Sequence, residues 1–156
     1  MPKGNPDNPF PELKVMNPDK RVFSFWLTAD VRDKAGQRIP VGEIYPGLLD
    51  YLDRGGPIHD NHTYKHVGKT LVLMPAKTRE GLDGVFGVGK IFDDNTVADE
   101  TWERMTGNDP NGIFYDAVSV GAKWLDHDFV FNKNQPEEIL KKLETFDISV
   151  TQRGEN

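Results

Sequence analysis

The chain has 156 residues, a length typical of one domain. Its formal net charge of -6 argues against a protein that binds the phosphate backbone of nucleic acids, because such proteins normally carry a basic stripe. The absence of cysteine excludes disulfides, thiolate metal sites and cysteine nucleophiles. No apolar run approaches the ~20 residues of a membrane-spanning helix. We therefore expect an acidic, soluble, single-domain protein with neither nucleic acid nor membrane as a partner.

The N-terminal segment is rich in proline. Five of the eleven prolines fall in the first eighteen residues. Because proline fixes φ and cannot donate a backbone hydrogen bond, residues 1–18 are predicted to form an extended arm, with Phe10 and Leu13 as its anchors. Residues 19–156 are predicted to form the single domain.

Three elements are predicted in the next part of the chain. Aromatic and branched residues favour a strand over 21–30. The segment 46–54 opens with proline and is followed by two glycines, which predicts a short helix. Residues 55–66 have turn chemistry without periodicity and are predicted to be a loop.

The central segment predicts a hairpin and a helix. Residues 67–77 and 84–92 are expected to form two strands joined by a turn. Asp94 or Asn95 can cap a helix that runs to Thr106 and ends at Gly107.

The C-terminal part predicts more strands. Residues 113–124 form a long strand candidate and 128–131 a shorter one, followed by a short helix over 136–143. Residues 145–151 alternate strictly, as a strand does. The expected fold class is α+β, with a mostly antiparallel β-sheet or barrel core and about three flanking helices.

Two sequence patterns point to ligand sites. Gly84, Gly89 and Lys90 have the spacing of a phosphate-binding loop, but Ile91 stands where that loop needs a Ser or Thr for Mg²⁺. We therefore predict no nucleotide cofactor. The cluster of His59, Asp60, His62 and His66 could hold a metal. It lacks the helical spacing of known zinc motifs and a clear fourth ligand, so a solvated polar loop is the simpler interpretation.

A third pattern concerns a nucleophile. A serine hydroxyl needs a base, usually histidine, to take its proton, and a third polar group to orient that base. His62, Ser119 and an acid near the C-terminus satisfy this logic. On composition alone, the favoured interpretation is that Ser119 is an ordinary strand residue that shares a face with Ile113, Tyr115, Ala117 and Gly121.

Several blocks of the chain together resemble the prohead maturation proteases of tailed bacteriophages, which are related in fold to herpesvirus assemblin. The ordered blocks are "GEIYPGLLDYL", "GPIHDNHTYKHVGK", "GLDGVFGVGKIFDDNTVADETWERM", "YDAVSVGAKW" and "TFDISVT". They cover residues 23–151, nearly the whole predicted domain. The resemblance implies an assemblin-like fold.

Carried over residue by residue, the resemblance implies a catalytic triad. Ser119 would be the nucleophile, and His62, six positions before Gly68, would be the general base. Asp147 stands where the family commonly has Glu, with Glu144 as the alternative acid. His59 is the alternative base. The strand pattern places Asp147 on a polar face with Ser149, which predicts a solvent-exposed face.

The resemblance also implies a role. The protein would be a serine endopeptidase that cleaves the scaffold, the major capsid protein and itself inside the phage procapsid, in the host cytoplasm, with a homodimer as a possible state. Two alternatives remain open. One is an inactive protease-like scaffold or assembly protein, and the other is a metal-dependent hydrolase that uses the histidine loop.

Overall fold

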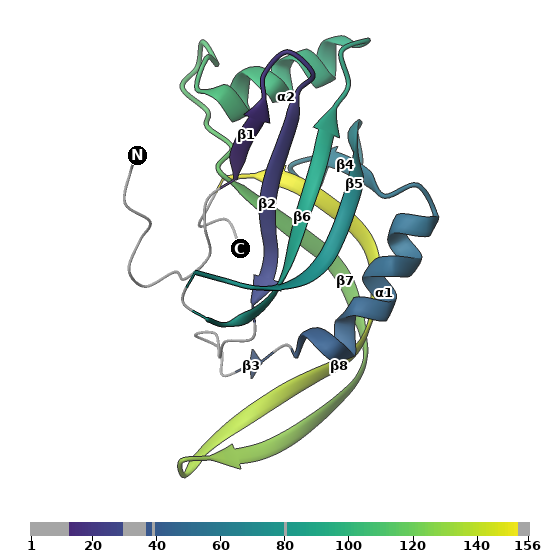
Figure 1. Ribbon diagram of the computed structural model, residues 1–156, viewed down its shortest axis with the longest axis vertical. Helices are drawn as coiled ribbons and strands as arrows, with labels where there is room; N and C mark the ends of the chain where they lie inside the picture. The colour runs from purple at the N-terminus through teal and green to yellow at the C-terminus, as the bar shows by residue number, and fades with distance from the viewer. Residues whose placement is uncertain (1–12, 30–36, 39, 80, 153–156) are drawn as a thin grey trace.

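The computed structural model describes residues 13–29, 37–38, 40–79 and 81–152. These residues form an α+β fold built on one curled, mostly antiparallel sheet with two helices (Figure 1). The strand order is β1-β2-β6-β5-β4-β8-β3, and β7 pairs with β8. The Leu13 amide donates to the Asp116 carbonyl at 3.3 Å, which links the β1 end of the sheet to the start of β7.

The first half of the sheet consists of four antiparallel strands in the order β1-β2-β6-β5. Its strands are β1 (Lys14–Asn17), β2 (Val22–Ala29), β5 (His66–Lys77) and β6 (Asp83–Ile91). β2 alternates as a half-buried strand should, with Phe23 and Phe25 buried in the core. The predicted strand over 21–30 and the hairpin of 67–77 and 84–92 are therefore confirmed.

The second half contains the parallel pairs. β4 (Pro57–Asp60) and the two-residue β3 (Gln37–Arg38) each run parallel to β8 (Gln135–Thr151). β8 also pairs with β7 (Ala117–Asn132) in a long antiparallel hairpin whose end projects from the body (Figure 1). This places β8 between β4 and β7, so that residues distant in sequence become neighbours.

Helix α1 (Val41–Asp53) covers part of the sheet with its apolar side. Val41, Ile44, Leu48 and Tyr51 are buried, and the helix contacts β8 and β5. The prediction of a helix beginning at Pro46 is wrong, because the helix begins five residues earlier, directly after Pro40. Pro46 lies inside it, although its ring removes one backbone hydrogen bond.

Helix α2 (Thr96–Thr106) agrees with its prediction. The Asn95 side chain accepts a hydrogen bond from the Ala98 amide at 2.7 Å, and Gly107 ends the helix in the left-handed conformation, with φ of 78°. Neither helix in the described part of the chain is long and apolar enough to cross a membrane.

Several other predicted elements differ from the structure. Residues 136–143 belong to strand β8 rather than to a helix, so the described residues contain two helices instead of about three. Residues 57–60 form β4 inside the predicted loop. The strands predicted over 113–124 and 128–131 are joined in one strand, β7, which begins only at Ala117, so that residues 113–116 are not in a strand.

The predicted N-terminal arm includes β1, a strand that the proline pattern did not predict. Leu13 packs against the core, as expected of an anchor, whereas Phe10 lies outside the described residues.

Candidate active site

Strand β4 positions the first histidine. It lies between β5 and β8, and its register sets His59 beside Ser149 on β8 and beside His66 on β5. His59 is only 8% exposed. A histidine predicted to lie in a polar loop is therefore part of the buried sheet.

The turn after β4 holds the second histidine in an unusual backbone conformation. Asn61, His62 and Tyr64 all have left-handed φ values, of 44°, 59° and 61°. Residues other than glycine rarely adopt this conformation, and it persists only where surrounding contacts impose it.

Strand β8 supplies some of those contacts. The Asn61 amide donates to the Val150 carbonyl, and the His62 amide donates to Ser149 Oγ, both at 3.0 Å. Thr151 Oγ1 donates to Asn61 Oδ1 at 2.6 Å. The turn is therefore attached to β8 at Asn61 and at the His62 amide.

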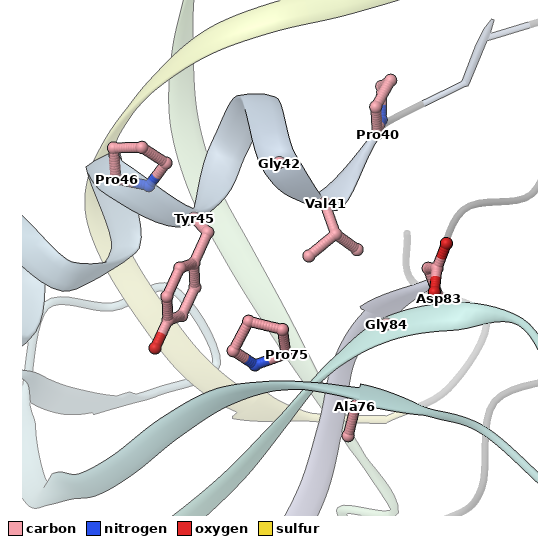
Figure 2. Close-up of a pocket in the computed structure, with 9 residues that line it drawn as sticks. All are labelled: Pro40, Val41, Gly42, Tyr45, Pro46, Pro75, Ala76, Asp83 and Gly84. Atoms are coloured by element: carbon pink, nitrogen blue, oxygen red, sulfur yellow. The ribbon is translucent and has the colours of Figure 1, made fainter.

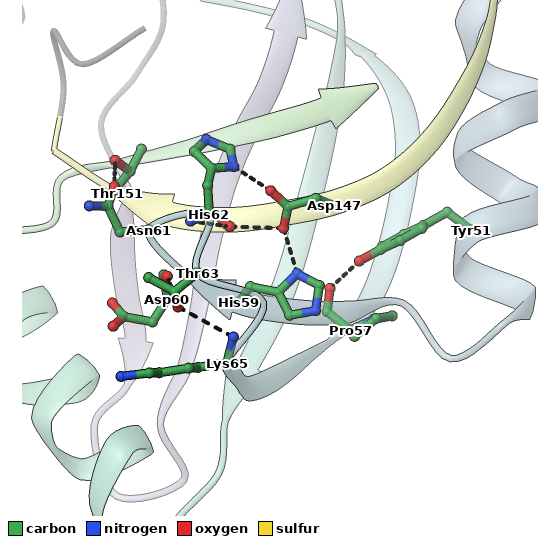
Figure 3. Close-up of polar contacts among 11 residues, drawn as sticks. Tyr51, Pro57, His59, Asp60, Asn61, His62, Thr63, Lys65, Asp147 and Thr151 are labelled. Carbon is green, nitrogen blue, oxygen red and sulfur yellow. Dashed lines mark hydrogen bonds and ion pairs between the residues drawn. The ribbon is translucent and has the colours of Figure 1, made fainter. Parts of the chain in front are cut away.

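Asp147 on β8 is the centre of the cluster, and Figure 3 shows both histidines directed at its carboxylate. His59 Nδ1 lies 2.5 Å from Oδ1, and His62 Nδ1 contacts Oδ2. A carboxylate can only accept hydrogen bonds, so each Nδ1 carries the proton and donates it. In a neutral imidazole this leaves Nε2 as the basic nitrogen.

The hydrogen bonds also determine the charge of Asp147, which is 1% exposed. Burial is the largest influence and by itself would raise the pKa of this carboxyl group. Hydrogen bonds from His59, His62 and Ser149, together with the charge interaction with His62, outweigh burial and lower the Asp147 pKa below its ordinary value. Asp147 is therefore an anion at neutral pH and can stabilise an imidazolium beside it.

Ser119 reaches the same side of the sheet from β7. It is paired directly with Ser149, and Gly121 is paired with Asp147. Side chains of directly paired residues share a face, with Cβ atoms about 4.5–5.5 Å apart. Ser119 therefore joins the face that carries Asp147 and Ser149, and it is partly exposed.

Ser149 is a member of the cluster that the sequence analysis did not assign. Its hydroxyl donates to Asp147 Oδ1 at 2.9 Å while accepting from the His62 amide. Because Ser149 is fully buried and its proton is directed at Asp147, its hydroxyl is suited to support and not to attack. The sequence signal that could have identified Ser149 is its position two residues after Asp147, on the same face of the strand.

Two expectations about the acid can be compared with the structure. The strand face that carries Thr145, Asp147, Ser149 and Thr151 was predicted to be solvent-exposed, and this prediction is wrong, because all four residues are at most 1% exposed. Glu144, the alternative acid, is exposed and lies opposite Lys123. Both histidines direct Nδ1 at Asp147 instead.

The remaining histidine of the loop does not contact the carboxylate. His66 packs its ring at 6.2 Å from that of His59 and at 5.2 Å from that of Phe92. Among the residues that the structure describes, no group of three or more His, Asp or Glu side chains is arranged to hold a metal ion.

A shallow apolar pocket lies elsewhere, between α1 and the β5–β6 hairpin (Figure 2). Its lining consists of Pro40, Val41, Gly42, Tyr45, Pro46, Pro75, Ala76, Asp83 and Gly84. It contains no pairing of a hydroxyl with a base, so the histidine–aspartate cluster is the better candidate for chemistry.

Comparisons of the chain with protein-family models, with curated proteins and with solved structures found no match.

Proposed function

We propose that the protein is a serine endopeptidase of the prohead maturation type, with Ser119 as nucleophile, His62 as general base and Asp147 as the orienting acid. The observation that carries the proposal is the hydrogen bond between His62 Nδ1 and the buried Asp147 carboxylate. Asp147 lies on the strand face that Ser119 shares. The proposal is also supported by the ordered sequence blocks that resemble this family. The assignment of this α+β fold to the assemblin-like type is part of the same proposal.

The chemistry follows from the roles of these groups. His62 Nε2 takes the Ser119 hydroxyl proton as Oγ attacks the scissile carbonyl carbon. The imidazolium then returns that proton to the leaving amine as the C–N bond breaks, which leaves an acyl-enzyme. Water, deprotonated by His62, releases the acid product and regenerates Ser119. Asp147 holds the imidazole tautomer and stabilises the imidazolium.

The proposed substrates are those of the resemblance: the scaffold, the major capsid protein and the chain itself. Cleavage would take place inside the procapsid, in the host cytoplasm, by a monomer or a homodimer.

Labelling with a fluorophosphonate tests the nucleophile without knowledge of the substrate. The chain contains only three serines, Ser24, Ser119 and Ser149. We expect one covalent adduct on Ser119, located by peptide mass spectrometry, and its loss in Ser119→Ala. Ser24→Ala, on β2 and outside the hydrogen-bonded cluster, is the matched control and should be labelled like the native chain.

Co-expression with a candidate capsid protein tests the activity. The native chain should shorten the capsid protein or itself, as measured by intact mass, and Ser119→Ala should not. Cutting by both versions that is blocked by EDTA would favour the metal-dependent hydrolase. Absence of both the adduct and the cutting would favour the inactive scaffold.

A further inference from the structure

Two imidazoles share the single carboxylate of Asp147, although a triad requires only one (Figure 3). Oδ2 accepts from His62, whereas Oδ1 accepts from both His59 and Ser149. The second histidine is therefore bonded to the opposite oxygen of the same group.

The two histidines differ in access to solvent. The His62 side chain is 38% exposed, and that of His59 is 10% exposed. His59 belongs to the central strand β4, and the Tyr64 ring packs at 5.5 Å from its ring. A group buried in this way cannot meet a peptide substrate, but it can act on Asp147.

We propose that His59 is a positioning residue, whose Nδ1–H holds the Asp147 carboxylate in the orientation that keeps Oδ2 on His62. The expected effect of His59 on the reactivity of Ser119 rests on the proposed function. The orientation of the Asp147 carboxylate does not, because it is a property of the folded chain.

The physical reason is the rotational freedom of a carboxylate. An aspartate has a broad energy profile for rotation about its last side-chain bond, so its oxygens need partners to fix their directions. Ser149 alone supplies one hydrogen bond to Oδ1, from a neutral hydroxyl. The short hydrogen bond from His59 adds a second donor, which is planar and buried. It also satisfies Asp147 Oδ1, since burying an oxygen without a full set of partners costs free energy.

The experiment compares two substitutions of His59. In His59→Asn the amide Nδ2 can stand near the position of Nδ1 and still donate, whereas His59→Leu keeps similar bulk without a donor. We expect fluorophosphonate labelling of Ser119 to slow by about 10- to 100-fold in His59→Leu, by analogy with the loss of an outer hydrogen-bond partner of a metal-ligating side chain. His59→Asn should recover most of the rate.

A spectroscopic measurement keeps the test independent of activity, and its first part, on the native chain, does not require His59→Leu to fold. Long-range ¹H–¹⁵N correlation spectra of the native chain report which ring nitrogen of each histidine carries the proton. We expect Nδ1–H for both His59 and His62, and a downfield Nδ1–H resonance of His62 that moves in His59→Leu but remains near its native position in His59→Asn.

Three results would overturn the inference. One is an Nε2–H tautomer at His59 in the native chain. Another is a His62 resonance that is unchanged in a folded His59→Leu variant. The third is native labelling of Ser119 in that variant. If neither the native chain nor any variant is labelled, the proposed function fails. The His62 resonance then still decides whether His59 positions Asp147.

Discussion

Gly121 occupies the position in β7 directly opposite Asp147. A Cβ atom added there would lie 2.9 Å from the Asp147 Cβ and 3.1 Å from its Oδ2. Contacts this short require a shift, either of the Asp147 side chain, whose carboxylate His62 contacts, or of the Phe146 ring, which would lie 3.0 Å from the new atom. Glycine at this position therefore provides the space that the acid needs.

We expect Gly121→Ala to slow fluorophosphonate labelling of Ser119 by about 10- to 100-fold, because misplacing a catalytic group by about 1 Å can cost about 100-fold in rate. The measurement is the pseudo-first-order rate of adduct formation by intact mass. Gly42→Ala is the control, since a Cβ at Gly42 on α1 meets nothing within 4 Å. A native labelling rate in Gly121→Ala would mean that Asp147 has more room than the structure indicates.

The sequence indicated the residues of the proposed triad but not the full cluster. His62 and Asp147 were predicted to be partners, and they are in contact. The roles of His59 and Ser149 could not be predicted, because both depend on β4 lying parallel to β8. That pairing joins segments about ninety residues apart, and neither segment by itself indicates which strand will lie beside it.

At the scale of elements, α2 shows how a local sequence signal fixes a boundary. Its cap residue, Asn95, has extended backbone angles and bonds the Ala98 amide. From the last turn of the helix, Arg104 donates to the Tyr115 hydroxyl at 3.2 Å and approaches Asp60, at the end of β4, at 3.9 Å. The Arg104 side chain therefore connects the last turn of α2 with the end of the strand that carries His59.

We expect Asn95→Ala to lower the free energy of unfolding by about 1 kcal/mol, because one amide at the start of the helix loses its acceptor. Urea unfolding monitored by circular dichroism measures this change. Asn95→Asp should retain the native value, since aspartate caps as well as asparagine does. Equal midpoints for Asn95→Ala and the native chain would contradict the assigned cap.

The other elements could be predicted only where the signals that determine them lie within the segment itself. The hairpin of β5 and β6 and helix α2 carry their signals within the segment, and both were predicted. Residues 136–143 have a helical spacing of apolar and charged side chains, but the ladder with β7 overrides it. Pro136 is accommodated because it lies next to the turn of the hairpin, opposite Phe131.

At the scale of the whole molecule, Asp147 connects the site to acid stability. Its pKa is lowered in the folded state, so the folded chain binds this proton less readily than the unfolded chain does. The resulting stabilisation is fully present above the ordinary Asp pKa of 3.8. It is lost as the pH falls from there through the lower pKa of the folded state.

We therefore expect the free energy of unfolding of the native chain to decrease in that acidic range, and to decrease less steeply in Asp147→Asn. Urea unfolding at a series of pH values measures both slopes. Asp83→Asn is the matched control, because this exposed aspartate pairs with Lys77 at the surface and should leave the slope nearly native. Parallel slopes for the native chain and Asp147→Asn would show that folding does not depress the Asp147 pKa.

The long hairpin of β7 and β8 determines where the chain can change length. A residue added at the turn, between Asn132 and Gln135, would extend the projecting end and leave the ladder below it in place. The same residue added between Asp147 and Thr151 would turn every later side chain of β8 to the opposite face, since strand side chains alternate with a period of two. Natural variation in length should therefore accumulate at the turn, while the last five residues of β8 should tolerate neither insertion nor deletion.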